Sequence, residues 1–150
     1  MSFEEYMRLA LEEARLAAKE GEVPIGAVVE KDGVVIARAH NQVETQKQGT
    51  AHAEILAIRK ASKIIGDWRL DGCTLYVTKE PCAMCAGAMV NCRISRVVFG
   101  CSDTRLGAAG STLAITNTPN ALHNVDVVSG VLEEECRRIL QDFFRQRRVD

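Results

Sequence analysis

The clearest indication of the fold is the stretch T-L-Y-V-T-K-E-P-C-A-M-C, Thr74 to Cys85. Its first five residues, 74–78, are β-branched, aromatic or apolar and predict a compact strand. Residues 79–81 predict a turn, and from Cys82 to about Val90 the apolar residues return at helical spacing. A strand, a short turn and a helix in direct succession are typical of a sheet that is covered by helices.

The alternation of helices and strands continues on both sides of this stretch. Ser2 and Glu5 form a capping box at the start of a helical pattern. Two valine-rich runs, Ile25 to Glu30 and Val34 to Ala39, flank Asp32-Gly33 and predict a hairpin. This order predicts an α/β fold with a mixed sheet and helices on both of its faces. The remaining predicted elements are a polar loop over Asn41–Thr50, a helix that His52 and Glu54 open, a strand within Ile94–Gly100, a glycine-rich loop over Asp103–Ser111, a weaker strand over Val125–Val128 and a closing helix from Glu133 to about Arg147.

The length and composition favour one globular domain, residues 1–150. A chain of 150 residues buries about 68 to 70% of its unfolded surface, which is enough for a core without disulfides. The apolar fraction of 47% and the formal net charge of −1 exclude a disordered or strongly basic chain, so any contact with nucleic acid must come from a local patch. The acidic start, Met1 to Glu5, and the lack of a long apolar run argue against a signal peptide or a membrane helix. We therefore expect a cytoplasmic protein that does not bind a membrane.

Two short strings carry the chemistry: His52-Ala53-Glu54 and Pro81-Cys82-Ala83-Met84-Cys85. One imidazole and two thiolates make three protein ligands for zinc, and the fourth position of a tetrahedral site then stays open for water, as in catalytic zinc sites. Glu54 can take the proton of that water, because zinc lowers the pKa of the water to about 7. Both strings open predicted helices, where the helix dipole favours the thiolate form of Cys82 and Cys85. The strings therefore predict hydrolytic chemistry.

Other uses of these residues stay open at this point. A lone Cys-x-x-Cys occurs in redox proteins, but that interpretation leaves His52 and Glu54 without a role. A structural zinc site would need a fourth ligand, for which His40, His123 and Cys73 are candidates. The cysteines outside the motif lie beside apolar residues and are expected to be packed thiols: Cys73, Cys92, Cys101 and Cys136.

The two strings resemble the signature of the zinc-dependent nucleobase deaminases, His-x-Glu followed by Pro-Cys-x-x-Cys. The resemblance covers most of the chain, and its later segments are similar to bacterial tRNA adenosine deaminases. The matching segments are residues 23–28, 50–54, 75–88, 96–100, 107–111 and 142–145.

This resemblance implies a three-layer α/β/α cytidine-deaminase-like fold with a five-stranded mixed sheet. It also implies a homodimer with one Zn²⁺ per chain, held by His52, Cys82 and Cys85. The implied reaction is the hydrolytic deamination of the wobble adenosine in a tRNA anticodon stem-loop to inosine. In that reaction a zinc-bound hydroxide attacks adenine C6, while Glu54 carries protons to N1 and to the leaving ammonia.

The resemblance further implies which residues contact the RNA. Asn41, the backbone N–H of Ala53 and the carbonyl of Pro81 match positions that bind the flipped nucleotide. Leu122 stands where the family carries an asparagine, so the chain departs from the family pattern at that contact. Contacts to neighbouring nucleotides, which recover the cost of unstacking the base, are implied for Asp103, Arg105, Phe144, Arg145 and Arg147.

Two other functions are compatible with the same strings. A free-base or nucleoside deaminase of the guanine or cytosine type shares them, but it has no need of an arginine-rich, aromatic last helix. A zinc-binding subunit without catalysis, which helps a partner bind RNA, has no need of Glu54. We therefore expect a tRNA-editing enzyme, with the free-base deaminase as the alternative.

Overall fold

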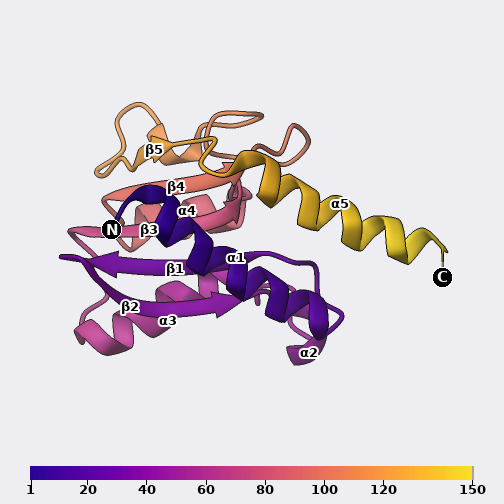
Figure 1. Cartoon of the computed structure of the whole chain (residues 1–150). Helices are drawn as coiled ribbons and strands as arrows, with labels where there is room; N and C mark the ends of the chain where they lie inside the picture. Colours follow the sequence, from indigo (N-terminus) through magenta and orange to yellow (C-terminus); the bar gives the residue numbers. More distant parts are fainter. Residues whose placement is uncertain (150) are drawn as a thin grey trace.

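A computed structural model describes residues 1–149 of the chain, and the side chains of Arg148 and Val149 lie outside what it describes. Figure 1 shows a layered molecule in which helices lie on both sides of one sheet. The elements are α1 (Phe3–Lys19), β1 (Gly26–Lys31), β2 (Val34–His40), α2 (Val43–Gln46), α3 (Ala53–Ile65), β3 (Cys73–Lys79), α4 (Ala83–Asn91), β4 (Arg96–Cys101), the 3₁₀ helix η1 (Ile115–Asn117), β5 (Asp126–Val128) and α5 (Glu133–Val149).

The sheet has five strands in the order β2-β1-β3-β4-β5. β1 runs antiparallel to both β2 and β3, whereas β3, β4 and β5 run parallel to one another. β2 therefore points in the same direction as β3 and β4, so the chain leaves all three strands at the same edge of the sheet. The five-stranded mixed sheet of a cytidine-deaminase-like fold is confirmed.

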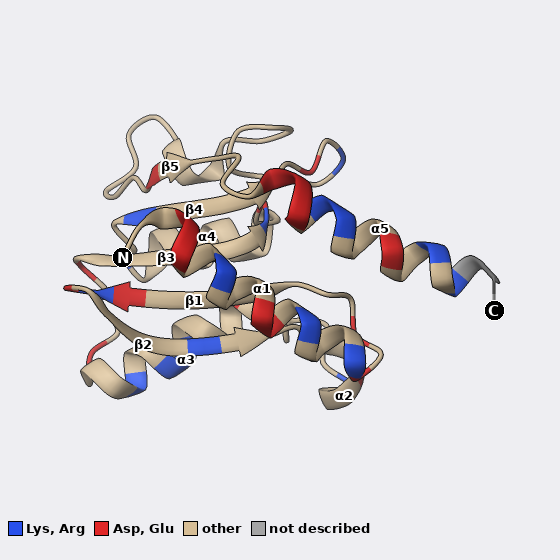
Figure 2. Ribbon diagram, viewed as in Figure 1, with Lys and Arg blue, Asp and Glu red and all other residues tan. Residues whose placement is uncertain are grey.

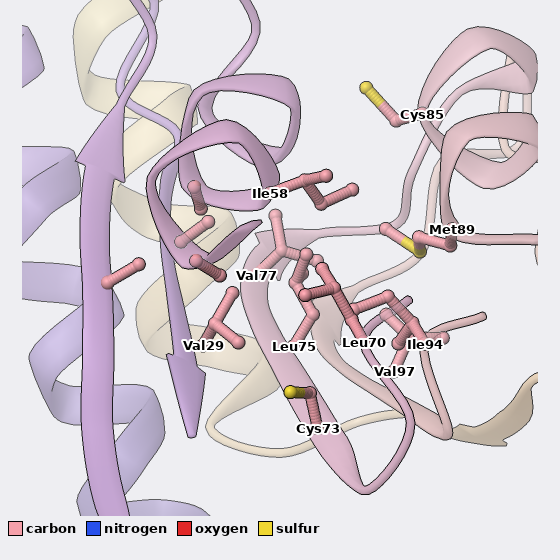
Figure 3. Close-up of a cluster of buried hydrophobic side chains, with 14 of the residues drawn as sticks. Val29, Ile58, Leu70, Cys73, Leu75, Val77, Cys85, Met89, Ile94 and Val97 are labelled. Carbon is pink, nitrogen blue, oxygen red and sulfur yellow. The ribbon is translucent and has the colours of Figure 1, made fainter. Parts of the chain in front are cut away.

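Alternate residues of the central strands enter two separate cores. Leu75 and Val77 of β3 point toward α3 and α4, in the cluster drawn in Figure 3. Tyr76, between them in sequence, points to the other face and packs against Tyr6 and Met7 of α1, in a second cluster that also holds residues of α5. Successive side chains of a strand point to opposite faces of the sheet, so a strand that is apolar throughout needs helices on both faces.

Two local predictions from the sequence are confirmed at the start of the chain. Ser2 and Glu5 form the capping box of α1, with each side chain bonded to the backbone N–H of the other residue. Asp32 and Gly33 both have positive φ, 52° and 81°, as a two-residue type I′ hairpin turn requires.

The prediction of a simple loop over residues 41–50 is wrong. That segment contains the short helix α2, whose N-cap residue Gln42 makes no side-chain capping bond. The donors at its start are satisfied by the Glu22 carboxylate, which comes from the segment after α1. A stabilising contact from a distant segment leaves no local pattern in the sequence, so the propensity of these residues did not indicate a helix. The short helix η1 was likewise not predicted.

None of the helices within residues 1–149 is both long and apolar enough to cross a lipid bilayer.

The helix α1 lies directly on the backbone of β1 at Gly26. A Cβ atom at this position would lie 2.0 Å from the Ala10 carbonyl oxygen and 2.5 Å from the Ala14 nitrogen. We expect Gly26→Ala to lower the free energy of unfolding by at least about 2 kcal/mol, because the backbone of α1 must move to admit a methyl group. Urea denaturation measures this loss.

Gly87→Ala is the matched control, because a Cβ there meets nothing within 4 Å. Alanine is the better helix former, so this variant is expected to be neutral or more stable by up to about 1 kcal/mol. Equal stability of the Gly26→Ala variant and the unaltered protein would contradict the close packing of α1 on β1.

Candidate metal centre and active site

The edge of the sheet where β2, β3 and β4 end carries all three predicted metal ligands. His52 is the N-cap of α3, which follows β2, and Cys82 is the N-cap of α4, which follows β3. Cys85 lies in the first turn of α4. The Nδ1 atom of His52 is 3.6 Å from the Sγ of Cys82 and 3.5 Å from the Sγ of Cys85. The fold thus brings His52 close to two cysteines that lie 30 and 33 positions later in the sequence.

These separations match the geometry of tetrahedral zinc. With Zn–N of about 2.0 to 2.1 Å and Zn–S of about 2.3 Å, a tetrahedral angle places the nitrogen and a sulfur roughly 3.6 Å apart. Within the described part of the chain, this is the one group of three histidine, cysteine or acidic residues whose ligand atoms converge. One nitrogen and two sulfurs leave a position for water, as in catalytic zinc sites.

The three candidates for a fourth protein ligand lie outside this group. His40 is held between the carboxylates of Glu13 and Glu20, at 3.0 and 2.8 Å. The Nε2 atom of His123 lies 2.7 Å from the carbonyl oxygen of Ile94. Cys73 is a buried thiol at the start of β3. The geometry therefore favours the open site over the closed structural one.

The two cysteines differ in their readiness to bind a cation. Hydrogen bonds from the Cys85 thiol and from the His52 ring lower the pKa of Cys82 to about 3, so Cys82 is a thiolate. The hydrogen bond to Cys82, together with burial, raises the pKa of Cys85. The low pKa of Cys82 thus comes from its hydrogen bonds, and the contribution of the helix dipole to the thiolate form stays a prediction. Cys85 gives up its proton when a metal ion replaces it, as metal binding to thiols requires.

Glu54 lies in the first turn of α3 with only 4% of its surface exposed. Burial raises the pKa of its carboxyl to about 7, although its own backbone N–H and the His52 ring act in the opposite direction. Its carboxyl also contacts the Cys85 thiol. Figure 3 shows Cys85 at the margin of the buried cluster. A carboxyl group with a pKa near neutrality can both accept and return a proton.

A cavity of about 240 Å³ opens beside Glu54 and His52. Asn41 and Ala53, which the family resemblance implies to be substrate contacts, both line its wall. The Asn41 amide donates to the carbonyl of Val23 and accepts from the backbone N–H of Val43, both at 3.3 Å, so its orientation is set by the backbone. The wall is lined by Glu22, Val23, Ile25, Asn41, Val43, Glu44, His52, Ala53 and Glu54.

Glu22 is a residue of this cavity that the sequence did not indicate. Only 1% of its surface is exposed, and its carboxylate accepts from the backbone N–H of Glu44, at 3.1 Å, and from the N–H and hydroxyl of Thr45, both at 2.6 Å. Burial alone would raise the pKa of Glu22, but these hydrogen bonds outweigh it and hold the pKa below its ordinary value. Glu22 thereby holds α2 over the cavity.

A groove of about 540 Å³ gathers four of the five residues implied to contact neighbouring nucleotides. Asp103 and Arg105 line it from the loop after β4, and Phe144 and Arg145 line it from α5. Asp103 forms an ion pair of 3.1 Å with Lys79 and accepts from the backbone N–H groups of Arg105 and Leu106. Hydrogen bonds from those two backbone groups and from Lys79 hold the pKa of Asp103 below its ordinary value, although burial acts in the opposite direction.

Arg147 lies apart from this groove. Its guanidinium donates to the carbonyl of Gly21 at 2.5 Å and lies 4.7 Å above the ring of Phe143. It lines a third hollow with Phe143 and Phe144, which also includes Val23 and Glu44 of the cavity wall. Phe144 therefore borders both the groove and this hollow, and the three depressions follow one another along the surface.

Pro81, a predicted contact, and Leu122, the departure from the family pattern, both lie away from the cavity and the groove. The carbonyl of Pro81 accepts from the backbone N–H of Ala108 at 2.9 Å, and Pro81 does not line the cavity. Leu122 is 97% exposed in the segment before β5. The structure thus gives neither residue a place in the wall of the cavity or the groove.

The sequence pattern of the MafB19-like deaminases matches residues 1–148. The chain belongs to this deaminase family. It is 52% identical to a tRNA-specific adenosine deaminase of Bacillus subtilis, over 95% of this chain and 89% of the relative.

Two solved structures resemble this deaminase in fold. The first comes from a study of A-to-I editing by tRNA:A34 deaminases at the wobble position of transfer RNA. Its TM-score is 0.87 at 47% identity, with 91% of this chain and 99% of the other covered. The second is a guanine deaminase of Bacillus subtilis, with a TM-score of 0.67 and 33% identity over 99% of this chain and 95% of the other.

The buried carboxyl of this deaminase makes its stability depend on pH. Burial raises the pKa of Glu54 from 4.5 to about 7, so the folded, metal-free chain binds its proton more tightly than the unfolded chain. Stability is therefore lost as the pH rises from about 4.5 to 7. We expect Glu54→Gln to raise the free energy of unfolding of the metal-free protein by about 3 kcal/mol at pH 8, and by less than about 1 kcal/mol at pH 5.

Urea denaturation in the presence of a chelator measures both values. Glu4→Gln, a change to an exposed glutamate of α1, is the control that should have no such pH dependence. A Glu54→Gln variant that is less stable than the unaltered protein at pH 8 would contradict the raised pKa.

Proposed function

We propose that this deaminase, acting as a single domain over residues 1–150, converts the wobble adenosine of a tRNA anticodon to inosine. The observation that carries the proposal is the sequence of depressions at the edge of the sheet. A cavity lined by Glu54 and by the metal ligand His52 leads past Phe144 to a groove lined by arginine side chains. A single flipped base and its neighbours on an RNA loop require such an arrangement.

Glu54 performs the proton transfers of the proposed reaction. His52, Cys82 and Cys85 would hold one zinc ion per chain, which when bound supplies Lewis-acid chemistry and lowers the pKa of a water molecule to about 7. Glu54 accepts the proton from the attacking water and delivers it to the ring nitrogen of the adenine. Glu54 then takes the proton of the new C6 hydroxyl and passes it to the amino group, so that ammonia departs and C6 becomes the carbonyl of inosine. Its position in the wall of a cavity that also contains His52 supports this role.

Asn41, Glu22 and Ala53 line the cavity that would hold the flipped base. Asn41 presents its amide to the cavity with both of its polar atoms oriented by the backbone. The backbone N–H of Ala53, in the first turn of α3, is free of an intrahelical partner and is available to an acceptor on the base edge.

The groove supplies contacts to the neighbouring nucleotides. Phe144 is 42% exposed, and stacking of a base on such a ring contributes about 1 to 3 kcal/mol. Arg145 has 75% of its side chain exposed and a long ion pair of 3.7 Å with Asp142, so it can turn to a phosphate. Figure 2 shows that α5 begins with acidic residues and carries basic ones further along. The cations therefore lie in the part of the helix that adjoins the depressions.

Two further properties are part of the proposal. We infer a cytoplasmic homodimer, on the basis of the family resemblance and of apolar side chains on the surface. Ile64 and Trp68, near the end of α3, are 68% and 51% exposed. Such residues are enriched where subunits meet.

The substrate class is tested by product analysis with the zinc-loaded protein. We expect ammonia release and inosine from a stem-loop that carries adenosine at the wobble position, and none from free guanine, cytosine or cytidine. Glu54→Gln should keep about one zinc per chain and lose at least about 10²-fold in turnover, because a positioned proton carrier contributes that much.

The guanine deaminase activity of a structural neighbour makes guanine the decisive control. Release of ammonia from guanine alone would overturn the proposal in favour of a free-base deaminase. Equal loss of zinc and of activity in Glu54→Gln would make Glu54 a metal ligand.

The groove is tested separately from the chemistry. We expect Phe144→Ala to weaken binding of the stem-loop by about 1 to 3 kcal/mol, and Arg145→Ala to weaken it and reduce its salt dependence. Both variants should keep their zinc. Arg69→Ala is the matched control for Arg145, because Arg69 is an exposed arginine in a similar pair with Asp67 at the far end of α3. Unchanged affinity in both groove variants would contradict this surface.

A further inference from the structure

The residue before the second metal string, Glu80, has a buried carboxylate with no assigned task. It is only 3% exposed, yet among the described residues it has no lysine, arginine or histidine within ion-pair distance. All hydrogen-bond partners of the carboxylate belong to the glycine-rich loop of residues 103–111. Oε1 accepts from the backbone N–H of Asp103 at 3.0 Å and from the hydroxyl of Ser111, and Oε2 accepts from the N–H groups of Ala109 and Ser111, both at 3.1 Å.

Four donors converge on this one carboxylate, and they come from both ends of the loop. Each carboxylate oxygen receives two of them, so the acceptor capacity of the group matches the donors around it. A backbone N–H that is buried without an acceptor costs about 1 to 3 kcal/mol. The conformation of the 103–111 loop therefore depends on a side chain that comes from the end of β3.

The loop also packs directly against this carboxylate. At Gly107 a Cβ atom would lie 2.4 Å from the Glu80 Cδ and 2.4 Å from the Asp103 carbonyl oxygen. The next residue, Ala108, donates its backbone N–H to the carbonyl of Pro81 at 2.9 Å. The loop is thus bound to both residues that precede Cys82, with no space for a side chain between them.

The contacts of Glu80 join the two parts of the proposed site. On one side, Glu80 lies two positions before the metal ligand Cys82. On the other, it fixes the loop in which Asp103 and Arg105 line the groove opposite Phe144. The Asp103 carboxylate in turn orients the backbone of Arg105. A displacement of the loop would move these groups relative to the metal ligands and leave the ligands in place.

We propose that Glu80 is a positioning residue, whose carboxylate holds the 103–111 loop so that the groove stays in register with the base cavity. This inference rests on the proposed function for its effect on RNA. The anchoring of the loop itself does not depend on the substrate.

The test is the variant Glu80→Gln in the zinc-loaded full chain. Glutamine has the same shape, but its NH₂ group faces N–H donors and cannot accept from them. With the stem-loop substrate, we expect KM to rise about tenfold or more, because hydrogen bonds to a charged group contribute about 1.5 to 3 kcal/mol. Turnover should stay within about threefold, and the zinc content should stay the same.

Trypsin provides a second measurement that needs no substrate. Arg105 is exposed in the loop, and cleavage after it requires local opening. We expect this cleavage to be about tenfold faster in Glu80→Gln, by the same loss of hydrogen bonds. Glu4→Gln is the control for both measurements and should match the unaltered protein.

An unchanged KM overturns the proposal, and so does a parallel loss of zinc and turnover, which would give Glu80 a role in the metal site. If Glu80→Gln does not fold, Ser111→Ala decides: it removes one donor to the carboxylate, and an unchanged KM and cleavage rate would overturn the proposal. If the unaltered protein makes no inosine, the proposed function fails. The cleavage rate then still decides whether Glu80 holds the loop.

Discussion

The site depends on one geometric constraint, which is that β2, β3 and β4 end at the same edge of the sheet. β2 and β3 share a direction because both pair antiparallel with β1, and β4 pairs parallel with β3. The segment after β2 leads to His52, the segment after β3 to Cys82, and the loop after β4 to Arg105. Ligands of open α/β sheets bind at this edge for the same reason. A reversal of any one strand would carry its functional residue to the opposite side of the molecule.

Three buried glutamates at this edge show how one chemical group serves different tasks. Glu22 accepts three hydrogen bonds from α2, and Glu80 accepts four from the 103–111 loop; these bonds hold the pKa of each below its ordinary value in spite of burial. At Glu54 burial raises the pKa to about 7, because it outweighs the few donors around that carboxyl. Hydrogen bonds that stabilise the charged form thus suit Glu22 and Glu80 to hold backbone segments in place, whereas burial suits Glu54 to move protons.

The chemistry and the choice of substrate are located in different parts of the structure. The proposed metal ligands and Glu54 lie on helix N-termini that the sheet positions, and a guanine deaminase resembles this chain in fold. The groove is built from a loop and from α5, elements whose side chains can vary without disturbing the core. In the proposed function, Arg105 and Arg145 therefore bear on which substrate binds, whereas His52, Cys82 and Cys85 bear on which bond is broken.

Local patterns in the sequence were enough to predict several parts of this protein. The capping box at Ser2, the Asp32-Gly33 turn and the helix starts at His52 and Cys82 follow from neighbouring residues, and the same patterns indicate the proposed metal ligands. The helix α2 within the predicted loop, the contacts that engage Pro81 and Arg147, and the roles of Glu22 and Glu80 became visible only in the folded structure. In each of these cases the bonded partner comes from a different segment of the chain: Glu22 lies 22 and 23 positions from its partners, and Arg147 lies 126 positions from Gly21. Sequence patterns report the periodicity and capping of one segment, while a hydrogen bond between distant segments exists only after the sheet has placed them side by side.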